Sequence, residues 1–160
     1  MSGLHQLLIM NLTWKTAFFD QLSLPEFYEI GRLRQEVFVV EQDCPYVDFD
    51  RMDYDCYHLW AADEKGHVHA YTRLVPKGIA YSADVSIGRV ITSQSARGNG
   101  LGRELMLKSI DACEELWPSE SIRISAQTYL LKFYNSLGFV STGKEYLEDG
   151  IPHTEMLFKK

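Results

Sequence analysis

Cysteine is scarce in this sequence, and the few cysteines lack the spacing of a structural site. The 160 residues include three of them, Cys44, Cys56 and Cys113, with no Cys-x-x-Cys pair. An odd number of isolated cysteines argues against both a disulfide framework and a structural zinc site. We therefore expect a reducing compartment, with the cytoplasm as the default location.

Long apolar runs and an excess of basic residues are also missing. No stretch of about 18 apolar residues is present, as a membrane-spanning helix would need. Residues 1–16 carry no basic region ahead of an apolar stretch, so we expect no signal peptide. Lys and Arg number 16 against 22 Asp and Glu, a net charge of −6. Because a nucleic-acid-binding face needs basic charge, we expect neither a nucleic-acid nor a membrane partner.

The remaining composition is that of an ordinary globular chain. Apolar residues make up 46% of the sequence and charged residues 24%. The length is close to the roughly 150 residues of one typical domain. No internal repeat and no linker rich in Pro, Gly or Ser divides the sequence. We therefore expect residues 1–160 to form a single domain.

The hydrophobic pattern predicts an alternation of strands and helices, in the order β-α-β-β-β-α-β-α-β-β. Gly88 interrupts the fourth strand, which indicates a β-bulge or a close approach of the backbone. The order predicts an α/β (or α+β) domain with a mixed sheet. The expected strands are residues 7–17, 56–62, 68–75, 81–92 and 122–127, then a hairpin over residues 139–158. The expected helices are residues 25–42, a helix that begins at residue 101 and stops before Pro118, and residues 129–137.

A glycine-rich turn before the second helix is the strongest functional signal. It reads Arg97-Gly98-Asn99-Gly100-Leu101-Gly102-Arg103. A helix N-terminus attracts phosphate through its unpaired N–H groups, and glycines let the backbone approach the ligand closely. The turn lacks the Gly-Lys-Ser/Thr ending of a P-loop and the G-x-G-x-x-G spacing of a dinucleotide site. A plain connection with two solvated arginines is the alternative interpretation.

Two motifs resemble those of the GNAT family of acyl-CoA-dependent N-acetyltransferases. Arg97-x-x-Gly100-x-Gly102 follows a strand, and Phe133-Tyr134-x-x-x-Gly138-Phe139 comes later in the chain. The resemblance to the ElaA-type subgroup runs from end to end, through residues 34–42, 87–90, 126–127 and 148–153. It implies a mostly antiparallel central sheet flanked by helices, with two splayed parallel strands and a β-bulge at Gly88. It also implies transfer of an acetyl group from acetyl-CoA to a primary amine, by direct attack in a ternary complex.

The resemblance assigns a coenzyme site to this chain. The backbone of one splayed strand would pair with the pantetheine arm, and the glycine-rich turn would hold the pyrophosphate. Gln127 stands where many family sequences have Asn, and its amide would also bond the pantetheine. The implied coenzyme-binding residues are Val90, Ile91, Thr92, Arg97, Gly98, Asn99, Gly100, Leu101, Gly102, Arg103 and Gln127.

Tyr134 is the residue that the resemblance assigns as general acid. A phenol near the departing sulfur can supply the proton that the thiolate needs. The alternative is an aromatic side chain packed on the inner face of a short helix. No single residue stands out as the base that takes the proton of the amine. By residue type the candidates are Glu41, His58, Asp84 and His153, and a chain of water molecules is a further one.

Five aspartates within 13 residues suggest how an acceptor is attracted. The spacing lacks the glycine and the closing glutamate of an EF-hand, so we expect no calcium site. The segment is interpreted either as a polar surface loop or as a negative rim that attracts a cationic amine. His67 and His69 are expected to face solvent as a pair without a third metal ligand. The five aspartates are Asp43, Asp48, Asp50, Asp53 and Asp55.

Two other functions stay open at this point. Arg34-x-x-x-Phe38, Asp50-x-x-Asp53 and Arg73-Leu74 also resemble acyl-homoserine-lactone synthases, which share the fold and use S-adenosylmethionine. The other candidate is a catalytically silent domain that binds coenzyme A as a sensor. The glycine-rich turn favours the acetyltransferase, with a small-molecule or peptide amine as acceptor. Proteins of this kind often pair through the sheet or the C-terminal strand, so a homodimer is a further expectation.

Overall fold

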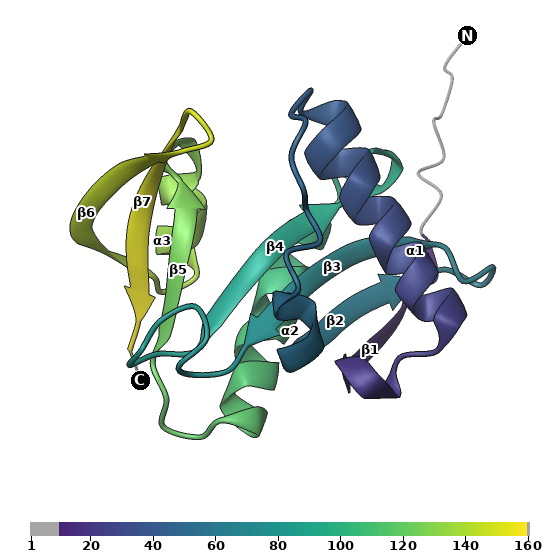
Figure 1. The fold of residues 1–160 in the computed structure, drawn as a ribbon, viewed down its shortest axis with the longest axis horizontal. Coiled ribbons are helices and arrows are strands. Elements are labelled where there is room, and N and C mark those ends of the chain that lie inside the picture. The colour runs from purple at the N-terminus through teal and green to yellow at the C-terminus, as the bar shows by residue number, and fades with distance from the viewer. Residues whose placement is uncertain (1–9, 160) are drawn as a thin grey trace, which may run out of the picture.

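The computed structural model describes residues 10–159. In this part of the chain two antiparallel sheets stand side by side, one with strand order β1-β2-β3-β4 and one with order β5-β7-β6 (Figure 1). Helices α1 and α2 cover opposite faces of the four-stranded sheet, and α3 lies beside β5. The strands are β1 (Thr13–Phe18), β2 (Tyr57–Ala62), β3 (Val68–Val75), β4 (Ser86–Thr92), β5 (Ile122–Gln127), β6 (Val140–Glu148) and β7 (Ile151–Phe158), and the helices are α1 (Leu24–Arg34), α2 (Leu101–Leu116) and α3 (Leu131–Ser136).

The predicted element order and the mixed α/β class are confirmed, with differences at several element ends. The strand expected over residues 81–92 begins only at Ser86. The expected start of the first strand, residues 7–9, lies outside the described residues, and the described strand begins at Thr13. The helix predicted over residues 25–42 is α-helical only to Arg34 and continues as a π-helical turn over Gln35–Glu41. Over seven residues, apolar positions three or four apart fit either kind of helix, so the pattern did not distinguish them.

The four-stranded sheet buries both of its faces, and the strands alternate between them. On β3, Ala70 and Leu74 pack with Leu105 of α2. Tyr71, between them in sequence, packs with Ile30 and Leu33 of α1 instead. This period of two follows from the strand geometry and fixes α1 and α2 on opposite faces. Ser23 and Glu26 form a capping box at the start of α1, which sets where that helix begins.

Strands β4 and β5 are the splayed pair that the family resemblance implied. Within the described residues they meet in a single parallel bridge, Val85 with Ile122. There the Val85 nitrogen donates to the Ser121 carbonyl at 3.1 Å, and the Arg123 nitrogen donates to the Val85 carbonyl at 2.9 Å. Beyond the bridge the two strands belong to different sheets. The outer edge of β4 is therefore left without a neighbouring strand.

The β-bulge is also present, but it does not lie at Gly88. Tyr71 pairs with Ile91 and Arg73 pairs with Gly88, so two residues of β4 stand opposite one residue of β3. The residue with left-handed backbone in this bulge is Arg89, with φ +53°. That conformation is unusual for a residue with a Cβ, so other contacts must hold it. Ion pairs from Arg89 to Asp48 and Asp50 supply them, which sequence alone did not reveal.

No helix in residues 10–159 combines the length and the apolar character needed to cross a membrane.

Candidate functional site

A cavity of about 900 Å³ lies where the two sheets diverge. Its walls come from β4 and β5, from the π-helical turn with the loop after it, and from the turn between β6 and β7. This volume lies within the range of small-molecule binding sites in proteins. The open edge of β4 faces this space, so unpaired backbone groups are within reach of a ligand.

Seven of the twelve residues predicted for the site line this cavity. The other five belong to the glycine-rich turn and the first turn of α2. Gly98, Asn99 and Gly100 are exposed, while the Leu101 side chain is buried in the core. Arg103 donates from Nη1 to Ser136 Oγ at 3.0 Å. The lining residues are Val90, Ile91, Thr92, Arg97, Gly102, Gln127 and Tyr134.

The glycine-rich turn has the geometry of an anion cradle. Gly98 and Gly100 have φ of +93° and +75°, which glycine adopts without strain. A Cβ built at Gly98, Gly100 or Gly102 would meet no atom within 4 Å, so each glycine faces open space. Gly100 is the N-cap of the 16-residue helix α2 and provides no side-chain cap. The N–H groups at this helix start are therefore oriented to receive a phosphate, and the residues fit a pyrophosphate.

Arg97 is held by a carboxylate from the opposite wall. Its two terminal nitrogens bind the two carboxylate oxygens of Glu41, with Nη2 to Oε2 at 3.0 Å. Nη2 also donates to the Thr92 carbonyl at 2.9 Å. The hydrogen bond from Arg97 lowers the pKa of Glu41, and Glu41 raises the pKa of Arg97. Both groups are thus charged at neutral pH and bound to each other.

Tyr134 is both a packed aromatic residue and a cavity residue. Its ring stands edge-on to Phe133 and Phe139, with centroid distances of 5.1 and 5.9 Å. Burial raises the pKa of its phenol to about 12. No hydrogen-bond acceptor for this hydroxyl is recorded within residues 10–159. The phenol is therefore protonated at neutral pH and available as a donor into the cavity.

The four candidate bases separate into two groups. His58 is buried, with Nδ1 2.6 Å from the Tyr71 hydroxyl and Nε2 3.0 Å from the Asp53 carbonyl. Asp84 accepts from Arg123 Nε at 2.7 Å. Neither residue lines the cavity, whereas Glu41 and His153 do. The structure thus places two of the four candidates where an acceptor can reach them.

His153 on β7 has its two ring nitrogens in different surroundings. Nδ1 lies 2.8 Å from the Ile151 carbonyl, which can only accept, so this nitrogen carries a proton. Nε2 lies 3.3 Å from a carboxylate oxygen of Glu148, whose side chain is 56% exposed. The ring stacks on Tyr146 at 6.1 Å between centroids. Nδ1 is thus held by the backbone, and Nε2 is the ring nitrogen that faces the carboxylate.

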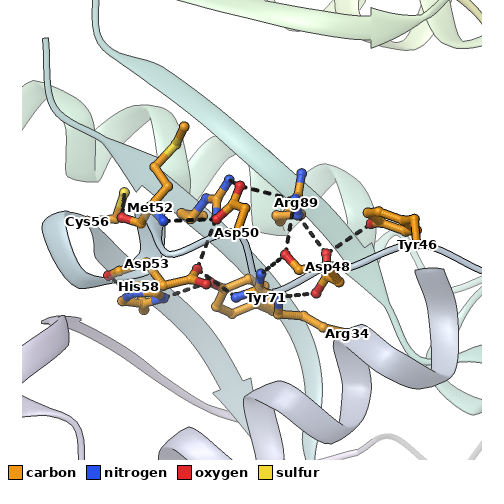
Figure 2. Close-up of polar contacts among 11 residues, drawn as sticks. Arg34, Tyr46, Asp48, Asp50, Met52, Asp53, Cys56, His58, Tyr71 and Arg89 are labelled. Carbon is orange, nitrogen blue, oxygen red and sulfur yellow. Dashed lines mark hydrogen bonds and ion pairs between the residues drawn. The ribbon is translucent and has the colours of Figure 1, made fainter. Parts of the chain in front are cut away.

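Three of the five clustered aspartates form an ion network with three arginines (Figure 2). Arg34 Nε binds Asp48 Oδ2 at 2.6 Å, and its Nη1 binds Asp53 Oδ1 at 2.7 Å. Asp48 and Asp53 are buried, so neither a polar surface loop nor a negative rim describes them. The interpretation of this segment as an acidic attractor is wrong for these residues, because arginines far away in sequence neutralise them.

Two further arginines complete the network. Arg73 binds Asp50 through both terminal nitrogens, at 2.8 and 2.9 Å, and Arg89 Nε lies 2.7 Å from Asp48 Oδ1. Burial alone would raise the pKa of Asp50, but hydrogen bonds from Arg73 outweigh it and lower the value. The network joins the loop over the cavity to β3 and to the bulge of β4. The network also contains Arg34, Arg73 and Asp50, three of the residues that carry the resemblance to acyl-homoserine-lactone synthases.

The sequence analysis did not identify two residues, Arg89 and Glu148, as part of the cavity wall. Arg89 lines the cavity from the bulge, and its guanidinium carbon lies 5.8 and 6.0 Å from the ring centroids of Phe38 and Tyr46. Its position directly after the strand glycine was the available signal. Glu148 lines the cavity beside His153, at the start of a turn whose Asp149 and Gly150 both have positive φ. An Asp-Gly pair between two strands is a recognised hairpin signal.

The histidine pair at the start of β3 is only half as predicted. His67 is exposed, with a side-chain exposure of 58%. His69 is only 12% exposed, with Nε2 2.9 Å from Asp63 and Nδ1 2.8 Å from Ser93 Oγ. The polar turn at Asp63 folds back over this histidine. In the described part of the chain no group of His, Cys, Asp or Glu is arranged to hold a metal ion.

Comparisons with known proteins extend these observations. A family model described as an acetyltransferase (GNAT) domain matches residues 34–160. The chain is 41% identical to a UPF0039 protein of Schizosaccharomyces pombe, over 91% of this chain and 96% of the relative. It is 40% identical to protein ElaA of Escherichia coli, over 91% and 95% of the two chains. The structure is similar to an acyl-CoA N-acyltransferase from Pseudomonas aeruginosa, with a TM-score of 0.87, 42% identity and coverage of 92% and 99%.

Proposed function

The chain belongs to the GNAT acetyltransferase family, and we propose that it transfers an acetyl group from acetyl-CoA to a primary amine. One observation supports this most strongly. The open edge of β4, the phosphate-binding turn and the Tyr134 phenol all border one cavity or its rim. These are the three features that such a reaction requires of the protein.

Residues from three elements would hold the coenzyme. The backbone of Val90 to Thr92 offers its unpaired groups to an extended pantetheine arm, as a neighbouring strand would. The N–H groups at the start of α2, together with Arg97 and Arg103, would bind the pyrophosphate. Gln127, across the cavity on β5, adds an amide that both donates and accepts. The coenzyme supplies the acetyl group as a thioester.

Tyr134 acts in this proposal as the general acid. The amine nitrogen bonds to the acetyl carbon, the carbon–sulfur bond breaks, the sulfur takes the phenol proton, and the ammonium group gives up two protons in all. One of those protons restores the phenol, and the other leaves to solvent. The raised pKa of Tyr134 keeps the phenol protonated until the sulfur leaves.

His153 is the proton acceptor that the geometry favours. Its Nδ1 is fixed as a donor to the Ile151 carbonyl, so its Nε2 provides the basic lone pair. The exposed carboxylate of Glu148, 3.3 Å away, connects that nitrogen to solvent. A proton taken from the acceptor therefore has a short route out. A small-molecule or peptide amine can enter beside this pair, and the cytoplasm would supply both substrates.

The first experiment is calorimetric titration of the purified protein with acetyl-CoA, in the wild type and in Arg97→Ala. We expect binding in the wild type and about 10- to 100-fold weaker binding in the variant, because a charge-assisted hydrogen bond is lost. Arg32→Ala, which removes an exposed arginine on α1, is the matched control and should bind as the wild type does. Absence of binding in the wild type contradicts the coenzyme assignment.

The second experiment compares Tyr134→Phe with the wild type in turnover of a panel of amines. Loss of the general acid should lower kcat by about 10²- to 10⁴-fold, while the Kd for acetyl-CoA stays the same. Unchanged turnover in the variant contradicts the assigned role. Tight coenzyme binding without turnover of any amine by the wild type would favour the silent sensor. The lactone-synthase alternative is less favoured, because its suggestive charges are satisfied within the ion network.

A further inference from the structure

We propose that the Glu41 carboxylate is a cation-binding site of the acceptor cavity, and that Arg97 fills it as an internal ligand until a phosphate group binds Arg97. The inference rests on the proposed function, because it takes the coenzyme's pyrophosphate as that phosphate. In this inference, the Glu41 carboxylate binds a positively charged group of the acceptor. The free protein then has this site closed, and the coenzyme-bound protein has it open.

The geometry of the Arg97–Glu41 pair carries the first step. Glu41 is the last residue of the π-helical turn and lines the cavity. Both of its carboxylate oxygens are bound by the Arg97 guanidinium. A bidentate guanidinium occupies the same oxygens that an alkylammonium or guanidinium of a substrate would use. The same guanidinium holds the carbonyl of Thr92, a group assigned above to the pantetheine arm.

The other acidic groups of the cavity wall are in a different situation. Asp50 is bound by Arg73 and Arg89, which belong to the ion network and are not expected to bind phosphate. Glu148 lies against His153, and Asp149 in the same turn has no cationic partner within residues 10–159. Among the acidic residues described on this wall, Glu41 is the one whose cation comes from the phosphate-binding turn. Coenzyme binding would therefore remove the cation paired with Glu41, whereas the aspartates of the ion network would keep their arginines.

The strength of the pair indicates the direction of the exchange. The side chains of Arg97 and Glu41 are 38% and 33% exposed, and pairs with this much solvent contribute little to stability. A pyrophosphate carries more negative charge than one carboxylate and is also held by the N-terminus of α2. Arg97 is consequently expected to leave Glu41 for the phosphate. The released carboxylate then faces the cavity without its cation and attracts a positively charged acceptor.

The decisive experiment is titration with coenzyme A of the wild type and of Glu41→Gln. If Glu41 competes with phosphate for Arg97, the variant should bind coenzyme A about twofold to fivefold tighter, the range that an exposed ion pair allows. Glu104→Gln is the matched control, because Glu104 is exposed in the first turn of α2 and has no ion pair recorded within residues 10–159. Equal or weaker binding by Glu41→Gln relative to this control overturns the competition.

A second titration tests the cation site itself, with 1,4-diaminobutane as the probe. In protein saturated with coenzyme A, the wild type should bind the diamine at least about tenfold tighter than Glu41→Gln, since a charged hydrogen bond is lost. Without coenzyme A the wild type should bind it as weakly as the variant does. Equal affinity of the two proteins in the saturated state overturns the site.

The two titrations separate this inference from the function on which it rests. A wild type that binds coenzyme A with the same Kd as Glu41→Gln defeats the inference alone. A wild type that binds no coenzyme A defeats the proposed function. Circular dichroism of Glu41→Gln and Glu104→Gln verifies that both variants are folded. A crystal structure of the complex adds a direct test, because Arg97 must contact the phosphates and not Glu41.

Discussion

Arg34 illustrates how one residue can determine the structure around a site. It is 1% exposed, and its guanidinium binds Asp48, Asp53 and the backbone carbonyl of Asp48. Without Arg34, Asp48 and Asp53 keep only Arg89 and Arg73 as partners, and the buried network has one negative charge in excess. Such an uncompensated buried charge costs far more than the net contribution of the intact pair. The residue belongs to α1 but fixes the loop that forms one wall of the cavity.

We predict that Arg34→Leu lowers the free energy of unfolding by about 3–5 kcal/mol. Urea denaturation followed by fluorescence measures the loss. Arg32→Leu is the matched control, since Arg32 pairs with Glu36 at 3.4 Å with both side chains more than half exposed. The control should change stability by about 0.5 kcal/mol or less. Similar losses in the two variants would show that the network is not stabilising.

At the scale of the element, α3 depends on the residue that ends it. Gly138 follows the helix with φ +103°, and its nitrogen donates to the Asn135 carbonyl at 3.1 Å. The Phe139 nitrogen donates to the Tyr134 carbonyl, which completes a Schellman-type end. A Cβ at Gly138 would lie 2.9 Å from Cε2 of Phe158. The backbone conformation and the aromatic neighbour thus both require glycine here.

We predict that Gly138→Ala lowers the free energy of unfolding by about 2–3 kcal/mol, from left-handed strain plus overpacking. Gly66→Ala separates the two causes, because Gly66 has φ +85° and no atom within 4 Å of a built Cβ. That control should lose only about 1 kcal/mol. Equal losses measured by urea denaturation would eliminate the contact with Phe158 as a cause.

The elements also show what the sequence could and could not predict. The spacing of apolar residues and the residue types in turns predicted the hairpin at Asp63, the helix α2 and the glycine that ends α3. Each of these features depends on residues that are close in sequence. Arg89 escaped the sequence analysis and Asp48 was misjudged, because the two are partners that lie 41 positions apart in the chain. His69 was expected in solvent, whereas the nearby turn at Asp63 and the more distant Ser93 both bind its ring. Motif order located the cavity wall, but only the fold showed that Glu41 reaches Arg97.

At the scale of the whole molecule, five carboxyl groups within residues 10–159 have pKa values below their ordinary range. At Asp50 and Asp53, burial raises the pKa, but hydrogen bonds from arginines lower it by more. At Glu41, the hydrogen bond from Arg97 is the main cause of the lowered pKa. Glu26 and Asp63 shift in the same direction, against burial, through nearby backbone N–H groups and side chains. The folded protein therefore binds fewer protons than the unfolded chain in acid.

We predict that these groups stabilise the folded protein, and that their full contribution to the free energy of unfolding is present above their unfolded pKa values of about 4. This contribution is lost as the pH falls through the lower values of the folded state. Urea denaturation at pH 7, 5, 4 and 3 should show little loss from these groups between pH 7 and 5 and a steep loss below 4. Asp53→Asn should flatten the acid part of the curve. Rising stability below pH 4 would contradict the assignment.

The lone bridge between Val85 and Ile122 has a consequence for how the protein avoids self-association. A strand edge with unpaired N–H and C=O groups is ordinarily a template on which other chains aggregate. Here that edge lies inside a cavity, between β5 and the loop tied down by the ion network. A strand of another chain would have to enter this recess before it could pair with that edge. The recess therefore shields the unpaired edge of β4 from other proteins.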